Sequence, residues 1–150
     1  CRKIRGCGMT FRLDQFLPYR LNVAATRISR RFAALYGAEA GLTTPEWRVL
    51  AYLDGSGAVS VRDIHAHVHL DKSIVSRAAS RLEQAGLVHK SGHDTDRRLV
   101  TLELTGQGRA LMARLGDIAT GFQAQLVAEL GPDGAAALER ALTRLIDAQD

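Results

Sequence analysis

The spacing of apolar residues predicts long amphipathic helices at both ends of the chain. Over residues 17–36, apolar side chains recur three or four positions apart, which is the period of a helix with one buried face. The same spacing returns over residues 111–130 and 138–146, with the turn sequence Gly-Pro-Asp-Gly between them. Because these stripes are too apolar to face water, we expect them to bury against each other or against a second copy of the chain.

Shorter elements are predicted between these terminal helices. A helix begins near Thr44, which we take as its cap, and Ser60 and Asp71 precede two further short helices,. Thr105 is the expected cap of the long helix that follows,. Two short helices with a tight connection form a helix-turn-helix candidate. Two strand-like runs follow, at residues 87–91 and 99–104, on either side of a turn-prone segment. They predict a β-hairpin.

The expected protein is therefore mainly α with one small β-hairpin. The helix-turn-helix and the hairpin occupy residues 43–105, and helical regions occupy residues 17–42 and 106–150. Residues 1–16 are read as an N-terminal extension that we expect to be loosely ordered. Its first eight residues look irregular, and Met9 could be the natural start.

Composition narrows the function classes. The chain has 150 residues, of which 46% are hydrophobic and 24% charged, as in ordinary soluble globular domains. No apolar run is long enough to span a bilayer, no signal-peptide pattern leads the chain, and Cys1 and Cys7 cannot form a disulfide framework,. A cytoplasmic setting fits best. The net charge of +4 permits nucleic acid as a partner without requiring it,.

Enzymatic activity is not expected. The sequence has no nucleophile elbow, no phosphate-cradling glycine loop and no paired acidic motif,. We therefore predict no catalytic residues and no cofactor.

The segment at residues 71–87 carries an unusual polar face when it is read as a helix at about 100° per residue. Short hydroxyl side chains surround one long cation, where a solvated face would carry long Glu and Lys chains. Small donors let a helix approach a DNA groove, Arg77 has the geometry to bind guanine, and Lys72 and Arg81 flank the face and could hold phosphates. The alternative is an ordinary surface helix. The polar face consists of Ser73, Ser76, Arg77, Ser80 and Gln84.

Two arginines are predicted at the tip of the hairpin. Arg97 and Arg98 follow Asp96 there, and an exposed charge pair at a loop tip contributes little to stability. A narrow minor groove attracts inserted arginine side chains. Asp96 can orient Arg98 through a charge-assisted hydrogen bond, which predicts that the tip presents a pre-oriented cation to DNA.

The sequence His-Ala-His-Val-His suggests a metal site as an alternative. His65 and His69 are four residues apart and would share a helix face, as metal-ligand pairs do. No carboxylate or cysteine at a helpful spacing completes the site, so three partly exposed imidazoles are the other interpretation. We predict no metal ligand here, while Asp63, His89 or His93 could approach the pair in the folded chain.

The whole pattern resembles the MarR family of winged helix-turn-helix regulators. The resemblance rests on Asp96-x-Arg98, followed after five residues by Leu104-Thr105 and then Gly108. The runs LTTPEWRVL and LDKSIVSRAASRLEQAGLV add to it, and together these features cover about residues 17–130. Arg98 resembles the wing arginine of the family and Asp96 its partner. The recognition face is matched by Ser73, Ser76, Arg77 and Ser80.

The resemblance implies a homodimer whose first and last helices intertwine. Each winged domain would read half of a pseudo-palindromic operator in double-stranded DNA, and most members repress transcription until a small-molecule effector arrives. A ligand pocket would lie between the dimerising helices and the winged domain, and Tyr36, Trp47 and His65 are candidates for its lining. A plain core position is the other interpretation of Trp47. A peroxide-sensing thiol is not expected, because no cysteine follows position 7.

Two further functions remain open at this point. One is a metal-responsive regulator of the same fold, which the histidines would serve. The other is a winged-helix module that binds a protein partner and no DNA.

Overall fold

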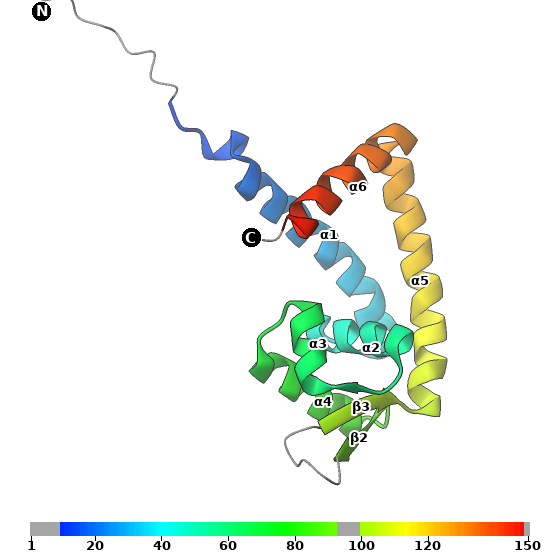
Figure 1. The fold of residues 1–150 in the computed structure, drawn as a ribbon. Coiled ribbons are helices and arrows are strands. Elements are labelled where there is room, and N and C mark those ends of the chain that lie inside the picture. Colours follow the sequence, from blue (N-terminus) through cyan, green and yellow to red (C-terminus); the bar gives the residue numbers. More distant parts are fainter. Residues whose placement is uncertain (1–9, 93–99, 149–150) are drawn as a thin grey trace, which may run out of the picture.

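The computed structural model describes residues 10–92 and 100–148 and is mainly helical (Figure 1). A small sheet lies beside helices in the middle of the chain, while long helices rise from this unit at both ends of the described chain. The helices are η1 (Leu13–Gln15), α1 (Leu17–Ala40), α2 (Thr44–Ser56), α3 (Val61–Val68), α4 (Lys72–Gln84), α5 (Gly106–Leu130) and α6 (Pro132–Asp147). The strands are β1 (Val59–Ser60), β2 (Val88–Gly92) and β3 (Val100–Leu104). The mainly α architecture with a small β-sheet is as predicted.

One helix cap differs from the prediction. Thr43, and not Thr44, caps α2: its hydroxyl accepts a hydrogen bond from the Glu46 N–H at 3.4 Å, and the Glu46 carboxylate accepts one from the Thr43 N–H at 3.1 Å. This reciprocal pair needs an acidic or amide side chain three residues after the cap. Thr43 has Glu46 at that position, whereas Thr44 has Trp47, which explains the shift.

The predicted caps of later helices are confirmed. The hydroxyls of Ser60 and Thr105 each accept a hydrogen bond, from the N–H groups of Asp63 and Gly108, both at 3.1 Å. Asp71 occupies the N-cap position of α4, although its side chain makes no capping hydrogen bond. These caps set where the helix-turn-helix and the long α5 begin.

The predicted hairpin is part of a three-stranded antiparallel sheet in the order β1-β3-β2. Strand β2 pairs with β3 so that Val88 lies opposite Leu104, and Val59 of β1 lies opposite Leu102. Strand β1 was not predicted, because two residues are too few to show the alternation by which a strand is recognised,.

The hydrophobic core lies where α2, α3 and α4 meet the sheet and the adjoining parts of α1 and α5. Its side chains come from the helix-turn-helix and the sheet and also from the long helices α1 and α5, so these parts of the fold share one core. The fully buried large side chains are Tyr36, Val49, Leu50, Leu53, Ile64, Val75, Leu82, Leu102 and Leu115. Among the described residues, no helix combines the length and apolar character that crossing a bilayer requires.

Candidate nucleic-acid interface

Helix α4 has one buried face and one exposed polar face. Val75, Ala78, Ala79 and Leu82 are buried, and the helix packs on α2 and β2. The preceding helix α3 ends at Val68, and the left-handed backbone of its C-cap residue His69 (φ 53°) turns the chain toward α4. The predicted recognition residues Lys72, Ser73, Ser76, Arg77 and Arg81 are exposed, and Ser80 is half-buried. A rigid helix thus presents short hydroxyls and long cations together.

Strand β2 adds a cation at one edge of this face. The ammonium of Lys90 donates a hydrogen bond to the Ser80 hydroxyl at 3.0 Å. The sequence prediction did not include Lys90, because its position in a strand does not say which helix the strand packs against. An ammonium group has three donors, so Lys90 keeps donors for a further acceptor such as a phosphate oxygen.

Helix α2 holds a cation at the other edge. One guanidinium nitrogen of Arg81, Nη1, lies 3.7 Å from Glu46 Oε1. Glu46 is only 7% exposed, while the Arg81 side chain is 66% exposed. A cleft of about 200 Å³ opens beside this pair, between the start of α2 and α4. It is lined by Thr43, Pro45, Glu46, Ile74, Arg77, Ala78 and Arg81.

The hairpin tip lies outside the described residues. Strand β2 is described up to Gly92 and β3 from Val100 onward. The predictions for Asp96, Arg97 and Arg98 fall between them, as does His93, so their roles stay predictions.

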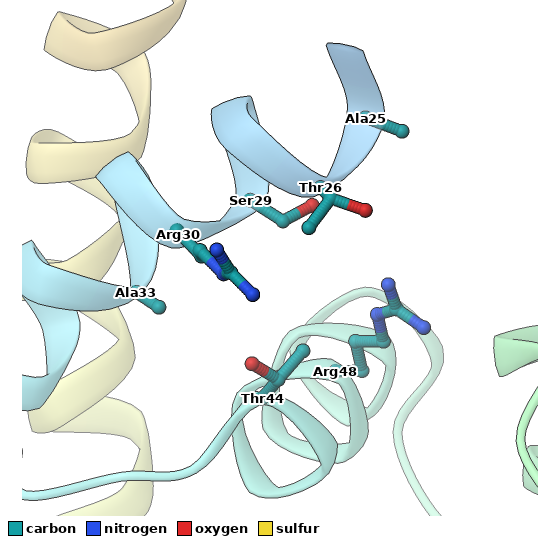
Figure 2. Close-up of a pocket in the computed structure, with 7 residues that line it drawn as sticks. All are labelled: Ala25, Thr26, Ser29, Arg30, Ala33, Thr44 and Arg48. Carbon is teal, nitrogen blue, oxygen red and sulfur yellow. The ribbon is translucent and has the colours of Figure 1, made fainter. Parts of the chain in front are cut away.

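A second cavity lies between α1 and α2 (Figure 2). Its volume is about 330 Å³. The side chains of Arg30 from α1 and Arg48 from α2 extend toward the space between the two helices, as do the hydroxyl-bearing side chains around them. The lining consists of Ala25, Thr26, Ser29, Arg30, Ala33, Thr44 and Arg48. The two guanidinium groups give this site a positive charge, and the hydroxyl groups add hydrogen-bonding partners.

The three residues predicted to line a ligand pocket do not line this cavity. Tyr36 and Trp47 stack at 5.6 Å between ring centroids, and Phe32 packs against both. Tyr36 is buried and shares a 2.7 Å hydrogen bond with the Thr44 hydroxyl, so it lies directly behind the lining. His65 lies on α3, where its Nδ1 is 2.6 Å from the carbonyl oxygen of Leu70.

The histidines of α3 have local roles in the structure. His67 stacks on Tyr52 at 5.2 Å, and its Nδ1 lies 2.8 Å from the carbonyl oxygen of Asp63. Within residues 10–92 and 100–148, no three His, Cys, Asp or Glu side chains are grouped closely enough to hold a metal ion. The contacts of His65 and His67 are those expected of helix-capping and packing imidazoles.

The terminal helices leave apolar side chains exposed. The apolar stripe predicted for α6 is not covered by the described part of the chain, nor is the start of α1 with the residues before it. The exposed large apolar side chains of these regions are Phe11, Leu13, Phe16, Leu17, Tyr19, Leu21, Leu138, Leu142, Leu145 and Ile146.

Comparison with known proteins agrees with this architecture. Residues 40–99 match the model of the MarR family. A MarR family transcriptional regulator of Silicibacter pomeroyi superposes with a TM-score of 0.82 at 28% identity, over 94% of this chain and all of that one. The chain belongs to the MarR family.

Other MarR-type relatives extend the comparison. The transcriptional regulator TtmR of Methylorubrum extorquens is 31% identical over 69% of this chain. The chain spans about half the length of the curated relatives it matches, 52% in the case of TtmR. The curated relatives are named as transcriptional regulators or repressors, and none of them is named as an enzyme.

Two further solved structures resemble the chain. The repressor CouR, bound to a 23-mer DNA duplex, superposes with a TM-score of 0.80 at 29% identity, over 89% of this chain and 94% of that one. BpsR of Bordetella bronchiseptica, whose DNA binding is regulated by 6-hydroxynicotinic acid, gives a TM-score of 0.73 at 26% identity, over 84% of this chain and 98% of that one.

Proposed function

We propose that the chain is a cytoplasmic, homodimeric regulator of transcription that binds a pseudo-palindromic operator in double-stranded DNA. It represses transcription, and a small anionic effector releases it from DNA. The observation that carries the proposal is the polar face of α4, where exposed Arg77 stands among exposed serines while the opposite face is buried.

The chemistry of this face suits direct reading of bases. Arg77 can donate two hydrogen bonds to the O6 and N7 atoms of a guanine in the major groove. Lys72, Arg81 and Lys90 surround the face and would bind phosphates, which fix the register of the helix on the duplex. The structure of CouR on a DNA duplex supports the proposal, because that fold is shared over most of this chain.

The wing arginines complete the proposed interface. Arg98 would enter the minor groove beside the half-site, with Asp96 orienting it and Arg97 adding a phosphate contact.

Substitution of Arg77 tests the proposal. Affinity would be measured by gel shift at fixed salt on the duplex that the wild-type chain protects upstream of its own gene. We expect R77A to weaken binding by about 1–3 kcal/mol and to lose discrimination at one base pair of each half-site. The control is R140A, which removes the same charge from exposed Arg140 on the side of α6 opposite its apolar stripe. Equal losses for the two variants would mean that Arg77 reads no base.

The exposed apolar side chains of α1 and α6 support the homodimer. Exposed apolar side chains that gather on a helix face mark a protein interface, and a second copy of the chain would cover them with the same surface in a two-fold arrangement. Such an arrangement would also place two α4 helices on successive turns of one duplex.

The cavity between α1 and α2 is the proposed effector site. Arg30 and Arg48 line it, and guanidinium groups bind carboxylates through paired hydrogen bonds. An aromatic carboxylate therefore suits the site, and the regulation of BpsR by 6-hydroxynicotinic acid supports this class.

The effector proposal predicts a defined response to 6-hydroxynicotinic acid as a probe. The acid should bind the free protein by calorimetry and shift the duplex from bound to free in a gel. In R48A, calorimetric affinity should fall at least about tenfold, since a charged hydrogen-bond partner is lost, while DNA binding without the acid stays at the wild-type level. Equal affinity of wild type and R48A for the acid would place the effector elsewhere.

A further inference from the structure

Glu46 has a buried carboxylate that serves two partners. Its Oε2 accepts the hydrogen bond from the Thr43 N–H that closes the capping box, and its Oε1 faces Nη1 of Arg81 at 3.7 Å. Burying a carboxylate is costly unless it is paired and hydrogen-bonded, and here each oxygen has its own partner. One partner belongs to the cap of α2, and the other belongs to the recognition helix.

The cap alone does not explain the negative charge. A glutamine at this position of a capping box also supplies the oxygen that accepts the N-cap hydrogen bond. A fixed negative charge beside a surface that binds phosphates is unfavourable by itself. The charge is directed at Arg81, whose side chain is 66% exposed.

We propose that Glu46 is a positioning residue that sets the Arg81 guanidinium to hold a phosphate of the DNA backbone. The inference rests on the proposed function. Arg81 follows Arg77 by one helical turn and lies about 40° around the helix axis from it, toward α2. A phosphate beside the groove that Arg77 enters is therefore within the range of Arg81.

The physical basis is the entropy of a long side chain. A free arginine side chain loses rotamer freedom when it is fixed, and this loss opposes binding. Glu46 engages one guanidinium nitrogen, and a guanidinium has five N–H donors, so donors are left for a phosphate. Because Glu46 is buried and held by the cap, it restricts Arg81 before DNA arrives, and part of the ordering cost is removed from binding.

The variant E46Q tests the proposal because two explanations predict opposite signs. Coulomb repulsion alone predicts that removing a negative charge strengthens DNA binding. Positioning predicts that E46Q weakens binding about 2- to 5-fold, the range of a partly exposed ion pair. The control is E83Q, which removes the charge of exposed Glu83 on the same helix and should leave binding equal or tighter.

A double-variant cycle separates positioning from a change in the fold. Affinity for the protected duplex would be measured for wild type, E46Q, R81A and the double variant. We expect E46Q to cause no loss of affinity once Arg81 is alanine, and R81A to lower the slope of log affinity against log salt by about one. A loss from E46Q that is equal in both backgrounds, a gain in affinity, or no change would each overturn the proposal.

Two further results distinguish a damaged fold, a failure of the proposed function and a failure of this inference. The thermal midpoint of E46Q should equal that of wild type within about 2 °C, since the amide preserves the cap. A wild-type chain that binds no duplex would overturn the proposed function and this inference together. A wild-type chain that binds, with additive E46Q and R81A effects, would overturn this inference alone.

Discussion

Gly108 lies in the first turn of α5, against the backbone of the segment that leads into β2. A Cβ atom at this position would collide with the carbonyl oxygen of Leu87 and would lie 3.3 Å from a methyl carbon of Leu104. The same carbonyl accepts a hydrogen bond from the Thr105 N–H at 3.0 Å, so it cannot easily move away. The glycine of the wing signature is therefore required by the close approach of two backbone segments.

A pair of glycine substitutions tests this packing. G108A should destabilise the chain by about 1–3 kcal/mol, because the backbone must separate to admit a methyl group. G121A, also in α5 but with nothing within 4 Å of its added Cβ, should stabilise it by about 0.5–1 kcal/mol through helix propensity. Denaturant unfolding of both variants gives the two values. A neutral G108A would show that the wing and α5 pack less tightly than described.

At the scale of elements, the long helices α1 and α5 are joined by side chains at their exposed surfaces. Arg31 donates two hydrogen bonds to the Glu129 carboxylate, at 2.6 and 3.2 Å, and its guanidinium lies 5.5 Å from the centre of the Phe122 ring. The hydrogen bond from Arg31 holds the pKa of Glu129 below its ordinary value, and the same bond raises the pKa of Arg31. The pair thus favours the charged forms.

This pair gives the stability a pH dependence of known sign. Because the pKa of Glu129 is lowered by folding, its contribution is complete above the ordinary value of 4.5 and is lost as the pH falls through the lowered pKa,. Wild type should therefore be more stable than E129Q at pH 7, by a small amount at this exposed site. The two should converge at acidic pH, below the lowered pKa of Glu129. Chemical unfolding across this range measures the difference, and a gap that does not change with pH would contradict the assignment.

Helices and their caps were predictable where the evidence for them lies within one short stretch of the sequence. The helices α1 to α6, their order and the caps at Ser60 and Thr105 follow from spacing and from hydroxyl side chains before apolar runs. Thr43 and Thr44 are both possible caps of α2. Only Thr43 has a glutamate three residues later, so Thr43 is the cap. Strand β1 escapes prediction because it exists only through its pairing with β3.

The candidate site was predictable in part for a related reason. Periodicity gives the polar face of α4, since that face depends on one helix. Lys90 and Glu46 reach the edges of that face from β2 and α2, so their part depends on how separate elements pack. The cavity lined by Arg30 and Arg48 likewise forms only where α1 meets α2, so no local pattern in the sequence indicates it.

At the scale of the whole molecule, two exposed surfaces have no partner within the described part of the chain. One is the apolar surface of α1 and α6, and the other is the cationic, hydroxyl-rich face of α4. A two-fold dimer would bury the first and pair the second. The proposed function depends on both events occurring in one assembly.

A footprint of the wild-type chain on the duplex upstream of its gene, at low salt, tests this account most directly. We predict protection of two half-sites related by two-fold symmetry, with centres about one helical turn or a multiple of it apart, and a stoichiometry of two chains per duplex. Absence of protection, or protection of a single half-site by one chain, would contradict the account.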